Sequence, residues 1–140
     1  MSFDSLREFR TVMDRTFAML DADPEMGPRL RDADVPQRFE FTDFDLVMNI
    51  RAASAGEDRN LVWTWIDDPD FEPKVTMAMS SEIANRYFQG KENIVLALAR
   101  RRIRQRGDIK AALALIPITE PIFARYRAMV ADEFPHLLVR

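Results

Sequence analysis

The chain has 140 residues, with 20 Lys and Arg, 23 Asp and Glu, one His and no Cys, and its formal net charge is −3. This length, with a hydrophobic share of 47%, predicts one globular domain over residues 1–140 that can build a substantial core. The lack of Cys in the sequence excludes disulfides, thiolate zinc sites, iron–sulfur clusters and a Cys nucleophile.

The N-terminal segment, residues 1–38, is expected to be helical. Between residues 5 and 20, apolar side chains recur at spacings of three and four, which indicates one buried helical stripe. The stripe consists of Leu6, Phe9, Val12, Met13, Phe17 and Leu20. Ser5 and Glu8 fit a capping box at its start. Pro24 ends this helix, a second short helix is expected over 24–31, and Pro36 closes the helical third.

The middle of the chain predicts β-strands. Apolar and polar residues alternate from Phe39 to Ile50, with a slip in parity at 42–43 that is typical of a tight turn or bulge. Two further strands are expected at 61–66 and 75–79, separated by the turn-forming sequence 67–70. We interpret these strands as an antiparallel meander.

The last third returns to helices around one basic strand. Ser80 or Ser81 caps a helix that ends before Gly90, and a second short helix is expected over 93–99. Residues 100–106 contain five Arg and a single apolar residue, Ile103, which favours an edge strand with one inward side chain. Gly107 and Asp108 then start a helix over 109–116, which Pro117 is expected to end. A final helix is expected to begin at 119–121.

The longest apolar segments cover residues 94–99 and 111–118, well short of the about 18–20 residues of a membrane span. The sequence shows no signal peptide, internal repeat or low-complexity tract. We therefore expect a cytoplasmic protein.

Three pieces of sequence, in this order, resemble the sterol carrier protein 2 family. They are VTMAMS at 75–80 followed by a helix, Gly90 with Lys91, and Gly107 with Asp108 followed by IKAALALIP. The resemblance covers residues 39–116 and leaves 117–140 as a C-terminal helix and tail. It implies an α+β fold, in which helices cover one face of a curved, mostly antiparallel five-stranded sheet and leave an apolar tunnel for lipids.

The chain departs from the family pattern in two places. The Gly that often opens the basic strand is here Ala99 or Arg100, and the C-terminal residues Leu138, Val139 and Arg140 differ from a peroxisomal address. The family has no invariant catalytic set, so the resemblance implies a protein that is not an enzyme.

Other chemistry finds little support in the residues. The one His, His136, lies near the C-terminus, and no Ser stands in a G-x-S-x-G motif, which disfavours a nucleophilic hydrolase. Asp67, Asp68 and Asp70 lack the Gly and distal Glu of a calcium loop, so we interpret them as a solvated hairpin turn. We expect no metal and no cofactor.

The arginines at 100, 101, 102, 104 and 106 allow several interpretations. They protect an edge strand against aggregation, bind an anionic head group, or contact an anionic membrane. The low pI, about 5.2, and the lack of interleaved aromatic residues argue against nucleic acid. We take Arg101, Arg102 and Arg104 as candidates for head-group or membrane contact.

The candidate lipid-binding residues are bulky apolar side chains on the strands and on the helices that would cover them. They are Met48, Trp63, Trp65, Met77, Met79, Phe88, Ile103, Leu113, Ile116 and Phe123. Met and wide aromatic residues suit a wall around variable lipid tails. The residues 121–132 are expected to form the lid.

These observations predict non-catalytic binding and carriage of a fatty acyl chain, acyl-CoA, phospholipid or isoprenoid. The alternative is an interaction or accessory module of lipid or quinone metabolism, with a packed core and with Trp63 and Trp65 meeting a partner. The sequence leaves a homodimer open. An enzyme acting through paired carboxylates ranks third.

Overall fold

In the computed structural model, which describes residues 2–140, five strands form one mixed sheet with the order β3-β2-β1-β4-β5. The strands are β1 (Gln37–Phe41), β2 (Leu46–Ala52), β3 (Leu61–Thr64), β4 (Val75–Met79) and β5 (Arg104–Gly107). Neighbouring strands are antiparallel except β1 and β4, which run parallel with Phe39 opposite Met77. The prediction of a mostly antiparallel five-stranded sheet is confirmed.

The antiparallel meander is wrong, because β4 does not pair with β3. The loop 65–74 is long enough to carry the chain back across the sheet, so that β4 occupies the second edge of β1. Such a connection is what a parallel pair requires, since a tight hairpin joins only antiparallel neighbours. Asp67, Asp68 and Asp70 therefore lie in a crossover loop and not in a hairpin turn.

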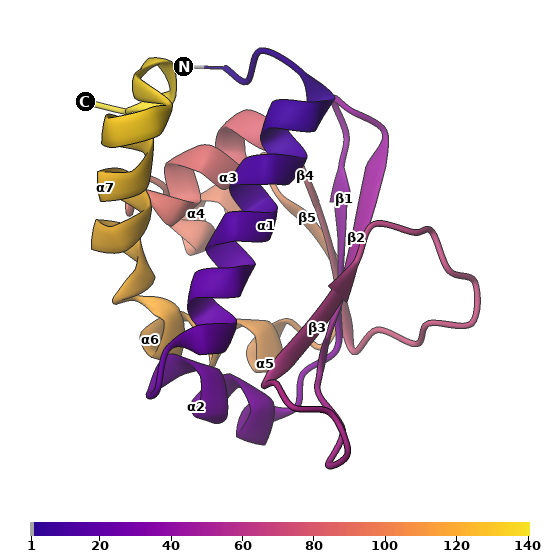
Figure 1. Cartoon of the computed structure of the whole chain (residues 1–140). Coiled ribbons are helices and arrows are strands. Elements are labelled where there is room, and N and C mark those ends of the chain that lie inside the picture. The colour runs from indigo at the N-terminus through magenta and orange to yellow at the C-terminus, as the bar shows by residue number, and fades with distance from the viewer. Residues whose placement is uncertain (1) are drawn as a thin grey trace.

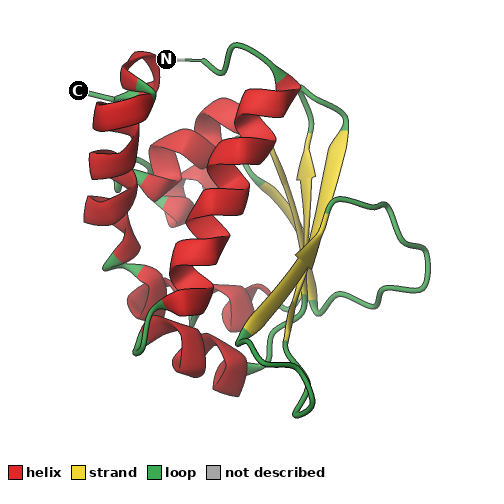
Figure 2. Ribbon diagram, in the orientation of Figure 1, coloured by secondary structure: helices red, strands yellow, loops and turns green. Residues whose placement is uncertain are grey.

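The helices lie together on one side of the sheet, as Figures 1 and 2 show. They are α1 (Leu6–Ala22), α2 (Met26–Ala33), α3 (Ser81–Phe88), α4 (Ile94–Ala99), α5 (Ile109–Leu113), α6 (Ile116–Thr119), α7 (Ile122–Glu133) and the 3-10 turn η1 (Pro135–Leu137). The predicted α+β class, with helices over one face of the sheet, is confirmed. No helix within residues 2–140 combines the length and apolar character that crossing a membrane requires.

Local sequence signals explain where α1 and α3 begin. The Ser5 hydroxyl oxygen accepts a hydrogen bond from the Glu8 amide at 3.0 Å, and the Glu8 carboxylate accepts one from the Asp4 amide at 3.0 Å. Ser80 caps α3 in the same way by accepting a hydrogen bond from the Ile83 amide. Each cap satisfies an amide that has no partner inside the helix.

The basic strand is shorter than predicted. It begins at Arg104 because the amides of Arg102 and Ile103 donate to the carbonyl of Ala97 and so close the end of α4. Arg101 adopts a left-handed backbone with a φ of 59° at this reversal, a conformation that favours glycine. The predicted position of this strand at the sheet edge is confirmed.

The helix predicted over 109–116 is divided in two. It stops after Leu113, and α6 restarts at Ile116 with Pro117 in its first turn. Proline lacks an amide hydrogen, and a first-turn residue needs none, so Pro117 begins a helix here instead of ending one.

Candidate functional site

An apolar cavity of about 110 Å³ lies between the sheet and the helices. It is lined by Met13, Phe17, Leu20, Leu30, Gln37, Phe39, Phe41, Met48, Ile50, Leu61, Met77, Met79, Ala84, Tyr87, Phe88, Ile94, Ala112, Leu113, Leu115, Ile116 and Thr119. The polar lining residues are Gln37, Tyr87 and Thr119, so within residues 2–140 no Asp, Glu, Lys, Arg or His lines this space. The cavity can therefore hold an apolar group, and it offers no carboxylate pair for acid–base chemistry.

Six of the predicted lipid-binding residues line this cavity. They are Met48, Met77, Met79, Phe88, Leu113 and Ile116. The three methionines come from β2 and β4, whose inward side chains form the floor, because alternate residues of a strand point to the same face. Leu113 ends α5 and Ile116 begins α6, so the break between these two short helices lies at the cavity wall.

Trp63 and Trp65, two of the predicted lipid-binding residues, do not line the cavity. Both indole N–H groups donate to the same carboxylate oxygen, Oδ1 of Asp14 on α1, at 3.0 and 2.7 Å. The guanidinium groups of Arg59 and Arg10 lie over the two rings, 4.9 and 5.3 Å from their centroids. An indole has a polar edge that needs a partner when buried, and that partner holds both rings in the seam between the sheet and α1.

Phe123 and the helix α7, which was predicted to form the lid, also lie outside the cavity lining. Phe123 lies on α7 and packs edge-on against Tyr87, with ring centroids 5.4 Å apart. No residue of α7 lines the cavity, and the parts of the wall expected from it are supplied by α5 and α6. The helix α7 instead packs beside α1 and α3.

Several lining residues were not among the predicted site residues. Met13, Phe17 and Leu20 belong to the apolar stripe of α1, which was predicted to be buried. They were missed because the residues of a filled core and those of a cavity wall recur along a helix with the same spacing. Tyr87 was also missed. Burial raises the pKa of its hydroxyl, although a hydrogen bond with Thr119 acts in the opposite direction.

A second hollow, of about 760 Å³, opens to the outside between α4, α5 and the start of β5. We call it the α4–α5 groove; it is lined by Val95, Leu98, Arg101, Ile103, Arg104, Gln105, Ile109 and Leu113. Leu113 lines both this groove and the inner cavity. Ile103, predicted as a lipid-binding residue, therefore faces the groove and not the cavity.

The three arginines predicted to contact a head group differ in their surroundings. Arg101 and Arg104 line the α4–α5 groove. Arg102 forms an ion pair with Glu92, with 2.7 Å between the guanidinium nitrogen and the carboxylate oxygen, and Glu92 also pairs with Arg86 at 3.4 Å. Arg102 thus has an ion-pair partner that it shares with Arg86, whereas Arg101 and Arg104 have no ion-pair partner within residues 2–140.

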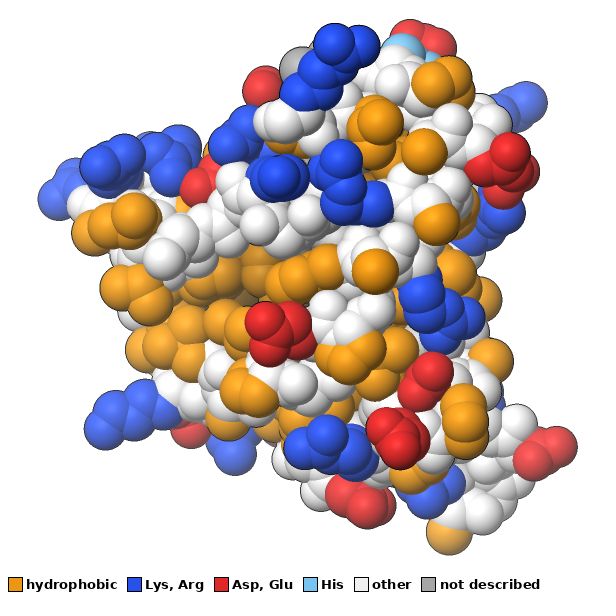
Figure 3. Space-filling view, turned by 90° about the vertical axis from the view of Figure 1, so that its left-hand side faces the viewer, with side chains coloured by type: hydrophobic (Ala, Val, Ile, Leu, Met, Phe, Trp, Pro, Cys, Tyr) orange, Lys and Arg blue, Asp and Glu red, His pale blue; other side chains and the backbone are white. Residues whose placement is uncertain are grey.

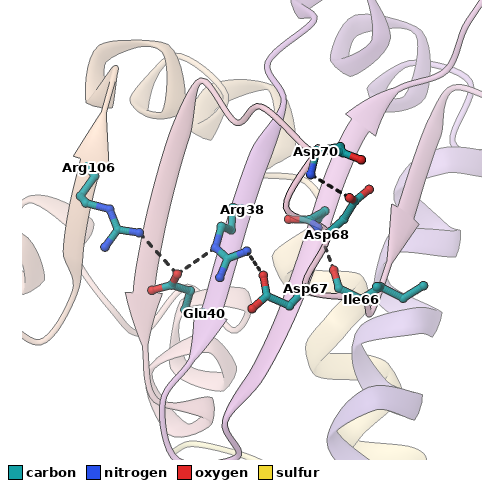
Figure 4. Close-up of polar contacts among 8 residues, drawn as sticks. Arg38, Glu40, Ile66, Asp67, Asp68, Asp70 and Arg106 are labelled. Atoms are coloured by element: carbon teal, nitrogen blue, oxygen red, sulfur yellow. Dashed lines mark hydrogen bonds and ion pairs between the residues drawn. The ribbon is translucent and has the colours of Figure 1, made fainter.

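The opposite face of the sheet carries a row of charges that links β1 to β5, across β4, and to the crossover loop (Figure 4). Glu40 on β1 binds Arg38 at 2.8 Å and Arg106 of β5 at 3.4 Å, and Arg38 also binds Asp67 at 2.6 Å. The Arg38 guanidinium lowers the pKa of the Asp67 carboxyl by its hydrogen bond and its charge. This row gives Arg106 and Asp67 a structural role in holding the strands and the crossover loop together.

The single histidine belongs to a small cluster at the chain ends. Nε2 of His136 lies 2.8 Å from Oε1 of Glu8 and 3.5 Å from Oδ2 of Asp4. Within residues 2–140 this is the one group of three side chains close enough to share a metal ion. Exposed ion pairs between chain ends bring the same side chains together without a metal, so we assign no metal site to this cluster.

Comparisons with solved structures identify the fold. No protein-family model matches the sequence, and no curated protein matches it. The UbiJ-SCP2 ubiquinone synthesis protein is similar over 87% of this chain and 95% of its own, with a TM-score of 0.61 and 11% identity. The sterol carrier protein domain 2 of Helicoverpa armigera is similar over 89% of this chain and 97% of its own, with a TM-score of 0.59 and 17% identity.

A further similarity is to part of a larger enzyme. The inverting sec-alkylsulfatase Pisa1 from Pseudomonas sp. matches 69% of this chain with a TM-score of 0.56 and 13% identity, and the match spans 16% of the sulfatase. The small domains, in contrast, match almost from end to end. This chain therefore has the fold of sterol carrier protein 2 domains.

Proposed function

We propose that this domain binds and carries a hydrophobic ligand, such as a fatty acyl chain, an acyl-CoA, a phospholipid or an isoprenoid. The observation that supports this proposal most strongly is the apolar cavity between sheet and helices, which shares Leu113 with the α4–α5 groove. A tail would enter through the groove, pass Leu113 and end against Met48, Met77 and Met79.

The size of the cavity defines how the ligand would fit. At about 110 Å³ it is smaller than the cavity of about 150 Å³ that admits benzene in an engineered core. The cavity therefore accommodates a short part of an alkyl chain, and the rest would extend along the groove of about 760 Å³. A longer buried stretch requires α5 and α6 to move away from the sheet.

Apolar burial provides enough free energy for useful affinity only with long chains. Each methylene removed from water contributes about 0.8 kcal/mol, so a chain of about 16 carbons offers up to about 13 kcal/mol. Lost translational and rotational freedom costs about 4–15 kcal/mol on association. We therefore expect affinity to rise by up to about fourfold for each added methylene until the groove is filled.

Bound lipid provides the direct test. The protein is purified without detergent, examined by native mass spectrometry, and extracted with organic solvent to identify what it carried. We expect a lipid adduct, or uptake of a fluorescent fatty acid by protein that emerges empty. Empty protein that also fails to take up the fatty acid would contradict the proposal.

A matched pair of variants on α5 locates the tail. Ala112 lines the cavity, so Ala112→Phe fills it, whereas the exposed Ala114 ends the same helix outside the cavity. We expect Ala112→Phe to reduce fatty-acid binding at least about tenfold, since several methylenes lose their site, and Ala114→Phe to bind like the wild type. Equal binding by both variants would place the ligand elsewhere.

An accessory protein-interaction module is the second candidate. The small cavity favours it, and one protein of similar fold is a ubiquinone synthesis protein. Trp63 and Trp65, which were expected to meet the partner, instead bind Asp14 beneath α1, which weakens this candidate. Stable complex formation by a chain that takes up no lipid would favour it.

A further inference from the structure

The helix α4 presents apolar side chains to solvent beside the α4–α5 groove. The exposed fraction of Val95 is 62% and that of Leu96 is 46%. Only two other large apolar residues within 2–140 are exposed, Leu6 and Ile66, and they lie on other elements. From the same short helix, Val95 and Leu98 line the groove and Ile94 lines the inner cavity.

Cations without partners adjoin this apolar surface. Arg100 ends α4, Arg101 follows it, and Arg104 starts β5; all three are exposed and form no ion pair within residues 2–140. The chain as a whole is acidic, with a net charge of −3, so this concentration of positive charge runs against its average. Figure 3 shows exposed apolar side chains along a hollow of the molecule, with Lys and Arg side chains near its rim.

We propose that Val95 and Leu96, with Arg100, Arg101 and Arg104, form a docking surface for an anionic lipid membrane. This inference rests on the proposed function and specifies where the ligand is exchanged. The arginines would bind lipid phosphates, and the two apolar side chains would enter the interface between head groups and acyl chains. The mouth of the groove would then face the membrane.

Charge and apolar exposure together identify the partner. Arginine binds phosphate through two parallel hydrogen bonds, and an anionic leaflet presents many phosphates without a fixed pattern. An apolar pair that protrudes next to the cations matches the boundary between head groups and acyl chains, where both kinds of contact are available at once. Docking there would bring the groove entrance, lined by Leu98 and Leu113, to the depth of the lipid tails.

The test measures binding of the full chain to vesicles by co-sedimentation. Phosphatidylcholine vesicles that contain phosphatidylglycerol are compared with vesicles of phosphatidylcholine alone, at low and high salt. We expect binding to the anionic vesicles that weakens with salt, and little binding to the neutral ones. Equal binding to both kinds, or to neither, would overturn the proposal.

Two double variants separate the charge from the apolar pair. Arg101→Asn with Arg104→Gln removes two cations, and Asn tolerates the left-handed backbone at position 101. We expect its affinity for anionic vesicles to fall about 30-fold. Its control, Arg7→Gln with Arg31→Gln, removes two exposed cations from α1 and α2. If both pairs reduce binding equally, net charge and not this surface is responsible.

For the apolar pair, Val95→Thr with Leu96→Gln is compared with Leu6→Gln and Ile66→Thr, which alter the other two exposed apolar residues. We expect only the α4 variant to weaken binding, and an unchanged affinity would overturn the apolar part of the proposal. Circular dichroism verifies that each variant is folded. Uptake of fatty acid in vesicle-free buffer tests carriage separately, so uptake without vesicle binding rejects only the docking surface.

Discussion

The hydroxyl of Tyr126 on α7 donates a hydrogen bond to Oδ1 of Asn85 on α3 at 2.7 Å, and both side chains are fully buried. Asn85 in turn donates to the carbonyl of Leu137 at 2.8 Å, and Gln89 accepts from the amide of Val139 at 2.8 Å. These buried polar atoms are all hydrogen-bonded, so the network fixes the C-terminal tail against α3. Burial also raises the pKa of the Tyr126 hydroxyl, which stays protonated as a donor.

This network predicts different costs for its two central residues. Asn85→Ala leaves the Tyr126 hydroxyl and part of Gln89 without partners and should lower the free energy of unfolding by about 3 kcal/mol. Tyr126→Phe removes one donor, while Oδ1 of Asn85 still accepts from Gln89, and should cost about 1 kcal/mol. Urea unfolding measures both values. Equal losses would show that the network does not act through Asn85.

The shared carboxylate of Asp14 predicts a change in tryptophan fluorescence. Asp14→Ala removes the acceptor of both indole groups, Trp63 and Trp65, which are the only tryptophans in the chain. We expect a loss of about 2 kcal/mol in stability and a red shift of the emission as the rings gain access to water.

Asp14→Asn is the matched variant, because its amide oxygen can still accept a hydrogen bond. The emission maximum of this variant should stay close to that of the wild type. An Asp14→Ala protein with unchanged emission would mean that the rings are held by packing alone.

The positions of α1, α3 and the strands of the sheet could be predicted approximately, because their signals are local. The Ser5 and Ser80 caps, the parity slip before β2 and the turn at Gly107 involve residues only a few positions apart. The pairing of β1 with β4 has no such signal. It joins residues 38 positions apart, such as Phe39 and Met77. The sequence of β1 does not indicate which strand pairs with each of its two edges.

The candidate site divides in the same way. Met48, Met77 and Met79 could be assigned because alternation along a strand defines which side chains face the helices. Trp63 lies opposite Ile50 and points to the same inward face. Because α1 lies above it, its indole N–H binds Asp14 and the ring does not line the cavity. The part of the cavity wall that α5 and α6 form could not be predicted. It depends on the break between these two helices, which packing against the rest of the chain determines.

An ion pair in the β2–β3 connection predicts how stability responds to acid. Hydrogen bonds from Arg51 and then from the Ser54 amide lower the pKa of Glu57 from 4.5 to about 2. The folded pKa lies below the unfolded one, so this contribution is complete above about pH 4.5 and is lost as the pH falls towards 2.

Thermal unfolding between pH 5 and 2 tests this contribution, with pH values chosen to span that shift. The melting temperature of Glu57→Gln should fall less steeply over this range than that of the wild type. Arg51→Gln should flatten the profile in the same way, because it removes the main cause of the shift. Parallel profiles for all three proteins would assign the acid sensitivity to other carboxyls.

Two glycines provide the last prediction because their surroundings differ. Gly107 has a φ of 89°, and a Cβ atom built on it would overlap the carbonyl oxygen of Lys74, which accepts a hydrogen bond from the amide of Asp108. Gly107→Ala must therefore shift the backbone where β5 meets β4, and we expect it to lower the free energy of unfolding by at least about 2 kcal/mol. Gly56 has nothing within 4 Å of such an atom, so Gly56→Ala should be neutral or should stabilise the protein by up to about 1 kcal/mol through the unfolded chain. Urea unfolding of the two variants side by side is the measurement: similar stabilities would show that β5 has room for a side chain beside the Lys74 carbonyl.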